Sequence, residues 1–238
     1  MNFYPINLKL EDKKVLIVGA GKVALRKFKR LSTTTAQIKV VSPDFNPGFD
    51  PYLAQNRDRY IFLKRKFKKE DLIKQDLIFI ATNKTELNKE IAFLAKKQKA
   101  LINVADNSAK SDFNVPALFK RGDLNLTISS GGNLPALAKN IRKKLENQFG
   151  IEYSILLEIM AEKRSMIISE IENSKLRKKI FRELASTSFL TEIRQIIDKE
   201  QANLLELKKE DYQQIITNIN NLISEKIKEI KIEFDNNY

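Results

Sequence analysis

Short apolar runs alternate with amphipathic stretches over the first hundred residues. Each run is bounded by polar residues, and two of the stretches between runs carry apolar residues at helical spacing. Such alternation favours a parallel sheet with crossover helices. The expected strands are 15–18, 38–42, 60–63, 77–81 and 101–104, and the expected helices are 22–31 and about 86–97, the second with Thr85 as its N-cap.

The pattern changes after residue 104. Residues 105–123 read mainly as loop with a short segment at 115–121, and residues 123–129 alternate with period two, which predicts a half-buried strand. A turn at 129–133 follows. Pro135 then opens an expected helix, because the first helical turn tolerates proline.

The last 88 residues read as helices throughout. All glycines and prolines lie at or before Gly150, so this part lacks the two strongest helix breakers. Its apolar stripes are more typical of core or dimer contacts than of a cofactor site. The sequence therefore predicts a parallel-sheet domain at 1–113, a small module at 114–150 and a helical domain at 151–238.

A glycine-rich turn follows the first expected strand. Residues 15–24 read VLIVGAGKVA, an apolar strand entering a G-x-G-x-x-A turn that opens a helix. Gly19 permits the tight turn, Gly21 lets the backbone approach phosphates, and Ala24 lets helix and strand pack closely. The turn indicates a dinucleotide pyrophosphate site; the alternative is a tight turn without a ligand. The predicted fold class is α/β, a Rossmann-type parallel sheet followed by a small α+β module and an all-helical C-terminal region.

Polar residues also follow the second expected strand. In an open parallel sheet, ligands bind outside the carboxyl ends of the strands. Asp44 follows Pro43 about 20 residues after the glycines and is placed to accept hydrogen bonds from an adenosine ribose, unless it is a turn residue. Because no arginine stands beside it, NAD is favoured over NADP.

Two further strand ends carry candidate chemistry. Ala81, Thr82 and Asn83 follow the fourth strand and are expected to line the cofactor groove. Asp106 follows the fifth strand, where a carboxylate is a candidate general base in a chain without histidine. The alternative for Asp106 is an Asx turn that ends the strand.

The turn before Pro135 is a candidate anion site in the second module. Ser129, Gly131, Gly132 and Asn133 lie at the start of the expected helix. Backbone N–H groups of such a turn can hold an anion, and the alternative is a plain strand-to-helix connection.

Composition narrows the chemistry. The chain of 238 residues carries a net charge of +13 but no histidine and no cysteine, so proton transfer falls to Asp, Glu, Lys, Tyr or water, and no metal site is expected. Residues 1–150 hold 29 lysines and arginines against 14 acidic residues, a balance of +15, which favours a polyanionic partner or a well-solvated surface. Without a signal peptide or membrane span, we expect a cytoplasmic protein.

Taken together, these motifs resemble the siroheme synthase N-terminal family, the precorrin-2 dehydrogenases, some of which are also sirohydrochlorin ferrochelatases. The resemblance covers residues 3 to about 149. It is carried by YPI at 4–6, the glycine turn continued by VALRK at 23–27, VVSP at 40–43, IATN at 80–83, NVAD at 103–106, DF at 112–113 with PA at 116–117, and RGDL at 121–124 leading to ISSGG at 128–132 and PALA at 135–138.

The resemblance implies NAD-dependent dehydrogenation of precorrin-2 to sirohydrochlorin by a homodimer, with ferrous iron as a candidate second substrate. Precorrin-2 carries eight carboxylate side chains, which suits the positive charge of residues 1–150. The family's essential aspartate falls on Asp106, its cofactor contacts on Lys22, Val23, Pro43 and Asp44, and a serine phosphorylated in some members on Ser129.

A rival interpretation is a non-enzymatic NAD-sensing or polyanion-binding module. It accounts for Gly19, Gly21 and the positive charge, and it predicts salt-sensitive binding of nucleic acid. It does not account for Asp106 or for the turn at 129–133. The enzyme interpretation expects a small tetrapyrrole partner, no nucleic acid and no membrane.

Overall fold

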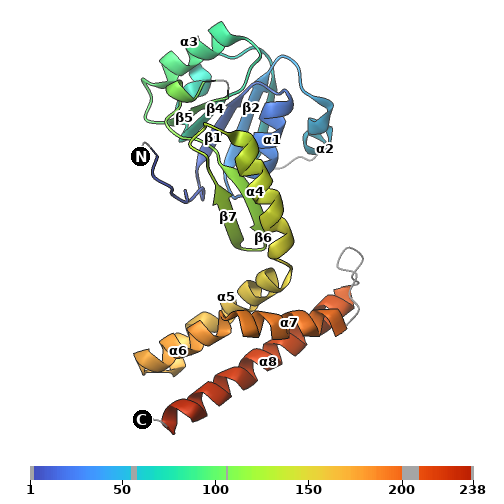
Figure 1. The fold of residues 1–238 in the computed structure, drawn as a ribbon. Coiled ribbons are helices and arrows are strands. Elements are labelled where there is room, and N and C mark those ends of the chain that lie inside the picture. Colours follow the sequence, from blue (N-terminus) through green and yellow to red (C-terminus); the bar gives the residue numbers. More distant parts are fainter. Residues whose placement is uncertain (1–2, 55–57, 106, 200–208, 237–238) are drawn as a thin grey trace. The chain divides into compact units, whose positions relative to one another are not determined.

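The computed structural model describes residues 3–54, 58–105, 107–199 and 209–236 (Figure 1). Within these residues the chain forms two compact units, Met1–Val115 and Pro116–Tyr238. No helix among them is long and apolar enough to cross a membrane. The predicted division into three domains, with boundaries after residues 113 and 150, stays a prediction.

The first unit is built on a parallel sheet with strand order β3-β2-β1-β4-β5. The chain adds strands on one side of β1 and then returns to add β4 on its other side, so a topological switch point lies between β1 and β4. This confirms the predicted Rossmann-type sheet. The strands are β1 (Lys14–Val18), β2 (Gln37–Ser42), β3 (Tyr60–Lys64), β4 (Leu77–Ile80) and β5 (Leu101–Val104).

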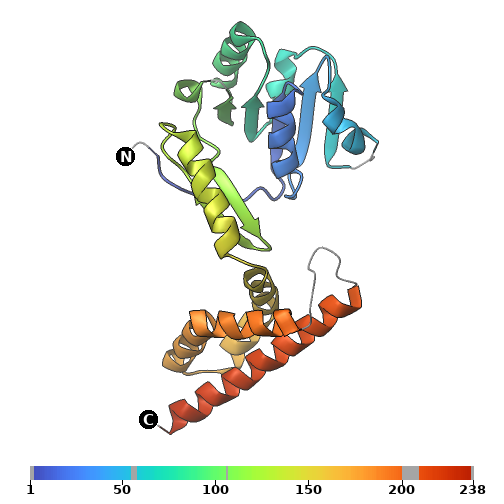
Figure 2. The same cartoon turned by 45° about the vertical axis from the view of Figure 1, so that its right-hand side comes forward.

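Helices cover both faces of this sheet (Figures 1 and 2). Helix α1 (Lys22–Leu31) buries Ala24 and Phe28 on one face, whereas α3 (Thr85–Ala95) buries Ile91 and Ala92 on the other. Phe28 is surrounded by the rings of Phe49, Tyr52, Tyr60 and Phe62. Short elements complete the unit: η1 (Pro47–Phe49), α2 (Asp50–Leu53), η2 (Lys69–Leu72) and η3 (Ser108–Lys110).

The second unit begins with an antiparallel hairpin of β6 (Ala117–Arg121) and β7 (Leu124–Ile128). Helix α4 (Pro135–Gln148) packs on this hairpin. Gly122 forms the hairpin turn with a φ of +53°, and a Cβ at this residue would lie 2.7 Å from the Cβ of Ser154. The turn therefore fits closely against the first residues of α5 (Glu152–Glu170), the helix that follows α4.

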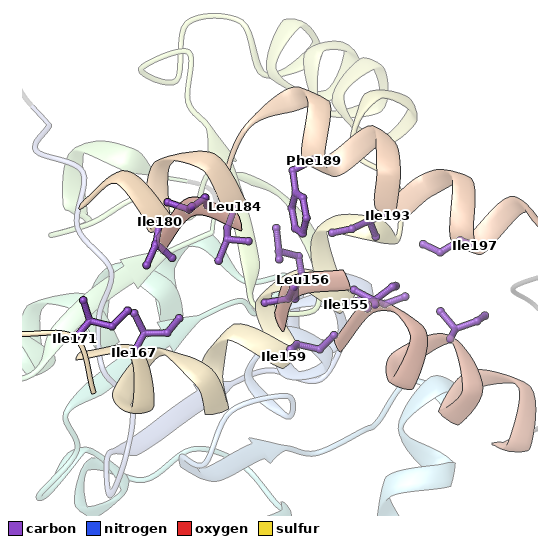
Figure 3. Close-up of a cluster of buried hydrophobic side chains, with 14 of the residues drawn as sticks. Ile155, Leu156, Ile159, Ile167, Ile171, Ile180, Leu184, Phe189, Ile193 and Ile197 are labelled. Carbon is purple, nitrogen blue, oxygen red and sulfur yellow. The ribbon is translucent and has the colours of Figure 1, made fainter. Parts of the chain in front are cut away.

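The rest of the second unit is helical and has its own core, in which buried apolar residues recur at every fourth position of several helices. Figure 3 shows side chains of α5, α6 and α7 pointing toward one another, and residues such as Ile155, Ile180 and Ile193 are fully buried there. This confirms the predicted all-helical C-terminal region. Its helices are α5 (Glu152–Glu170), α6 (Ser174–Leu184), α7 (Thr187–Lys199) and α8 (Lys209–Asp235).

One expected cap is wrong. Thr85 is the first residue of α3, and Lys84 holds the cap position without a side-chain hydrogen bond. The hydroxyl of Thr82 instead accepts a hydrogen bond from the Lys84 N–H at 3.2 Å and donates to Asn88 Oδ1 at 2.5 Å. A threonine three residues upstream thus organises the start of this helix.

Candidate functional site

The turn between β1 and α1 is closely packed at its first glycine. Gly19 has a φ of +101°, a region that favours glycine. A Cβ at Gly19 would lie 2.4 Å from the carbonyl oxygen of Ala81, and the Gly19 N–H donates to the carbonyl of Val41 at 2.8 Å. The turn therefore sits directly between the carboxyl ends of β2 and β4.

The second glycine of this turn faces open space. Gly21 is the N-cap of α1 with a φ of −79°, no side chain caps the helix, and its first turn contains no acidic residue. A Cβ at Gly21 would meet no atom within 4 Å, while Lys22 and Val23 are exposed and Ala24 is buried. An exposed, uncapped helix N-terminus of this kind fits a dinucleotide pyrophosphate.

The residues after β2 lie at the same edge of the sheet. Pro43 and Asp44 are both exposed. The N–H of Asn46 donates to the carbonyl of Ala20 at 2.9 Å, and its side chain accepts a hydrogen bond from the N–H of Gly48 at 3.0 Å. Asn46, which the sequence analysis did not single out, therefore anchors the segment containing Asp44 to the glycine turn.

The residues after β4 border the switch point. The Ala81 N–H donates to the carbonyl of Val18 at 2.8 Å, so Ala81 continues the pairing with β1. Thr82 is bonded to the buried Asn88, whose Nδ2 donates back to the Thr82 carbonyl at 3.2 Å, and Asn83 is exposed. A signal for Asn88 was present in the sequence, since it shares the apolar face of its helix with Ile91.

Asp106 lies outside the described residues. Before it, the N–H of Ala105 donates to the carbonyl of Ile80 at 2.9 Å. After it, the hydroxyl of Ser111 donates to the carbonyl of Asn107 at 3.1 Å and accepts a hydrogen bond from the N–H of Val104 at 2.9 Å. These bonds hold the flanks of the segment that follows β5. A shallow depression next to it is lined by Thr85, Asn88, Lys89, Val104, Asn107 and Lys110.

A half-buried cation lies beneath this edge on the α1 face of the sheet. The ammonium of Lys27 donates to Asn103 Oδ1 at 2.7 Å and lies 4.9 Å from the centre of the Phe79 ring. Burial, and then the charges of Arg26 and Arg30, lower the pKa of Lys27 from 10.5 to about 8. The sequence pattern gave no signal for this pair, because Lys27 and Asn103 are 76 residues apart.

The turn at 129–133 belongs to the second unit and is exposed. Gly131 and Gly132 have φ values of +64° and +88°, and the Ser129 hydroxyl accepts a hydrogen bond from the N–H of Gly131 at 3.2 Å. Asn133 donates its N–H to the carbonyl of Ser130 at 3.1 Å. Helix α4 then starts without a side-chain cap and without an acidic residue in its first turn, as α1 does.

The structure thus brings the three sets of residues after β1, β2 and β4 to one edge of the first unit, and it describes the turn at 129–133 separately. Among the described residues, no group of three or more His, Cys, Asp or Glu side chains is arranged to hold a metal ion.

Comparisons with known proteins agree with this geometry. Residues 6–117 match a family model described as "Putative NAD(P)-binding". The chain is 28% identical over 215 residues to a siroheme synthase of Mannheimia succiniciproducens, covering 90% of this chain and 44% of that protein. It is 33% identical over 202 residues to a siroheme synthase of Psychromonas ingrahamii, covering 85% and 42%. The chain therefore spans less than half the length of these curated relatives.

A solved structure matches over nearly its whole length. The protein described as "SirC, precorrin-2 dehydrogenase" superposes with a TM-score of 0.67 at 27% identity, covering 90% of this chain and 98% of that one. The similarity therefore includes the helical region as well as the parallel sheet.

Proposed function

Since the chain belongs to the siroheme synthase N-terminal family, we propose that it catalyses the NAD-dependent dehydrogenation of precorrin-2 to sirohydrochlorin. The observation that carries this proposal is the turn between β1 and α1. Gly19 is packed against the Ala81 carbonyl while Gly21 opens the first turn of an uncapped helix. That combination fits the pyrophosphate of a dinucleotide.

The cofactor contacts follow from this edge of the sheet. Lys22 and Val23 lie on the exposed first turn of α1, and Ala81, Thr82 and Asn83 border the neighbouring strand end. We assign Asp44 to the adenosine ribose, because a carboxylate accepts hydrogen bonds from both ribose hydroxyls and repels a 2′-phosphate. NAD rather than NADP is the expected cofactor.

In the reaction the bound NAD would supply a hydride acceptor, and the macrocycle loses two electrons and two protons. One hydrogen leaves as hydride and the other as a proton. We assign that proton to Asp106, which passes it to water, because a carboxylate that follows a strand end is a candidate general base in a chain without histidine. The extended conjugation of the product favours this direction.

Positive charge accounts for the choice of a polycarboxylate substrate. The surplus of +15 lies in residues 1–150, which include the glycine turn. Ser129, Gly131, Gly132 and Asn133 form a second exposed turn at an uncapped helix, and we assign it to the tetrapyrrole. A homodimer is the expected assembly.

Ferrous iron is the proposed substrate of a second activity. Inserting Fe²⁺ into sirohydrochlorin releases two pyrrole protons, and Asp106 is the group that we expect to accept them. The variant Asp106→Ala should therefore abolish metal insertion and weaken dehydrogenation. Full retention of both activities would remove Asp106 from the mechanism.

The test is anaerobic incubation of the protein with precorrin-2 and NAD, following NADH and the tetrapyrrole spectrum together. Stoichiometric NADH with sirohydrochlorin is the expected result, and a protein-dependent spectral change after Fe²⁺ addition would add the second activity. NAD binding without turnover would favour the sensing module, and salt-sensitive binding of nucleic acid would strengthen that alternative.

A further inference from the structure

Lys27 is an unusual cation for a helix that otherwise exposes its charges. Its side chain is half-buried. Its ammonium donates a hydrogen bond to the neutral amide of Asn103 and lies over the face of the Phe79 ring. Within the described ranges no carboxylate forms an ion pair with it. Burying a charge without a counter-ion is unfavourable, and groups of this kind concentrate at functional sites.

The contacts of Lys27 join separate parts of the cofactor edge. Asn103 and Phe79 are paired residues near the carboxyl ends of β5 and β4, and Lys27 belongs to the helix whose first turn faces the expected pyrophosphate. The amide of Asn103 also donates to the carbonyl of Phe113 at 2.8 Å, and the Phe113 ring packs edge-on against Phe79. The hydrogen bond of Lys27 thus ties α1 to the strand that leads into residue 106.

We propose that Lys27 is a positioning residue for the dinucleotide, and that its protonated form holds α1 and the end of β5 in the arrangement that binds the cofactor. The proposal rests on the proposed function, from which it takes the dinucleotide site. A charged amine donates a stronger hydrogen bond to the amide oxygen of Asn103 than a neutral one. The charged form is attracted to the face of the Phe79 ring more strongly than the neutral amine, so deprotonation loosens the tie.

This tie titrates in an accessible pH range, because the pKa of Lys27 is lowered to about 8. On its own helix the nearby charges are Arg26 and Arg30, which both favour the neutral amine. Strands β4 and β5 face it with a ring and an amide that do not titrate. The segment after β5 brings Asp112, whose carboxylate accepts a hydrogen bond from the Ile102 N–H at 2.9 Å.

The composition of the chain makes the titration easy to isolate. Without histidine or cysteine, the ordinary side chains titrate outside the range from pH 7 to 9, and the α-amino group is the remaining common titrating group there. Replacing Lys27 by arginine keeps the positive charge and removes the titration, since the guanidinium stays protonated. The α-amino group is the same in every variant.

The experiment is a fluorescence titration of the full chain with NADH between pH 7 and 9.5. We expect the affinity of the wild type to fall about tenfold with a midpoint near pH 8, the size of a typical coupling between two sites. Lys27→Arg should bind NADH with little dependence on pH, and Lys27→Met should bind weakly at every pH. Lys29→Met removes an exposed charge from the same helix and should follow the wild type.

Linkage supplies a second readout that does not depend on activity. If protonation of Lys27 favours binding, NADH must raise the pKa of Lys27 by the reciprocal amount. NMR of lysine labelled with ¹³C at Cε measures this shift, with the Lys27 signal assigned by its loss in Lys27→Arg. A purely structural role would lower the melting temperature of Lys27→Met without altering the pH profile of NADH binding.

The outcomes separate the two proposals. Wild-type affinity and pH dependence in Lys27→Met, or an unchanged pKa of Lys27 on NADH binding, would overturn the role of Lys27 alone. Binding of NADH with the expected pH profile but no oxidation of precorrin-2 would contradict the proposed reaction alone. A wild-type protein that binds no NADH would overturn both the cofactor assignment and the role of Lys27.

Discussion

The glycines of the β1–α1 turn are constrained by different things, although they are two residues apart. Glycine is required at residue 19 because φ is positive there and because a Cβ would clash with the carbonyl oxygen of Ala81. Gly21 has an ordinary φ and an empty space where a side chain would be. The fold alone therefore accounts for Gly19, whereas Gly21 is the glycine that we propose serves the dinucleotide.

Replacing Gly19 by alanine should destabilise the first unit. The new Cβ would lie 2.4 Å from the Ala81 carbonyl oxygen at a positive φ, so the strand end must move. We expect a loss of about 2–4 kcal/mol in the free energy of unfolding, measured by urea denaturation. A loss below about 0.5 kcal/mol would mean that the turn is looser than the structure indicates.

Replacing Gly21 by alanine should separate binding from stability. Its backbone conformation suits alanine and the added methyl meets no protein atom, so we expect the unfolding free energy to change by less than about 1 kcal/mol. NADH affinity should fall by about tenfold or more, because the methyl occupies the path of the phosphates. Unchanged affinity would place the pyrophosphate elsewhere.

Lys27 should make the stability of the protein depend on pH in the alkaline range. Its pKa is about 8 in the folded state and about 10.4 when unfolded, so between these values the unfolded state binds more protons. Below pH 8 the buried amine is charged and lowers the free energy of unfolding. That free energy therefore rises as the pH increases from about 8 to about 10.5. Relative to Lys27→Met, the wild type should gain about 1 kcal/mol over this window, a value reduced for the exposed part of the side chain.

Sequence reasoning reached the residues with local signatures and missed those paired across the fold. Gly19 and Gly21 stand in a recognisable strand-turn-helix context. The bond between Lys27 and Asn103 joins α1 to β5, and helical periodicity assigns Lys27 to the polar side of its helix. Pairing of this kind depends on sheet order, which the linear pattern does not contain.

At the level of elements, hydrophobic patterning predicted the five strands of the first unit and β7 to within one residue at each end, but it did not identify β6 as a strand. The buried strands of the first unit read as continuous apolar runs because helices cover both faces of the sheet. The pattern was weaker at 105–123, where Phe119 is the one buried residue of β6 and the other four residues are partly or fully exposed. A short, one-sided strand leaves little signal until its partner β7 is known.

The β6–β7 turn offers a test of this hairpin. In Gly122→Ala, the new Cβ would meet Ser154 at 2.7 Å, which adds a steric clash to the strain of a positive φ. We expect a loss of about 2–3 kcal/mol in the unfolding free energy, measured by urea denaturation. The control Gly132→Ala also has a positive φ but open space, so it should lose only about 1 kcal/mol. Equal losses would show that Ser154 does not constrain the turn.

For the whole molecule, the distribution of charge is the feature with a kinetic consequence. Residues 1–150 carry +15 and the remaining residues −2. If this surplus attracts a polycarboxylate, the KM for precorrin-2 should rise several-fold between about 50 and 500 mM salt. Added salt shortens the Debye length and so screens the attraction between protein and substrate. Steady-state assays at several salt concentrations test this, and kcat should stay nearly constant. A KM that does not respond to salt would contradict electrostatic capture.

The order of strands in the sheet also governs how the nascent chain can fold. β1 pairs with β2 on one side, but its other neighbour, β4, is synthesised only after β3. Until Leu77–Ile80 leaves the ribosome, one edge of the fully apolar segment Val15–Val18 has no strand to pair with. Unpaired apolar edges recruit other chains. The strand to whose end we assign the cofactor is thus, during synthesis, a point at which aggregation competes with folding.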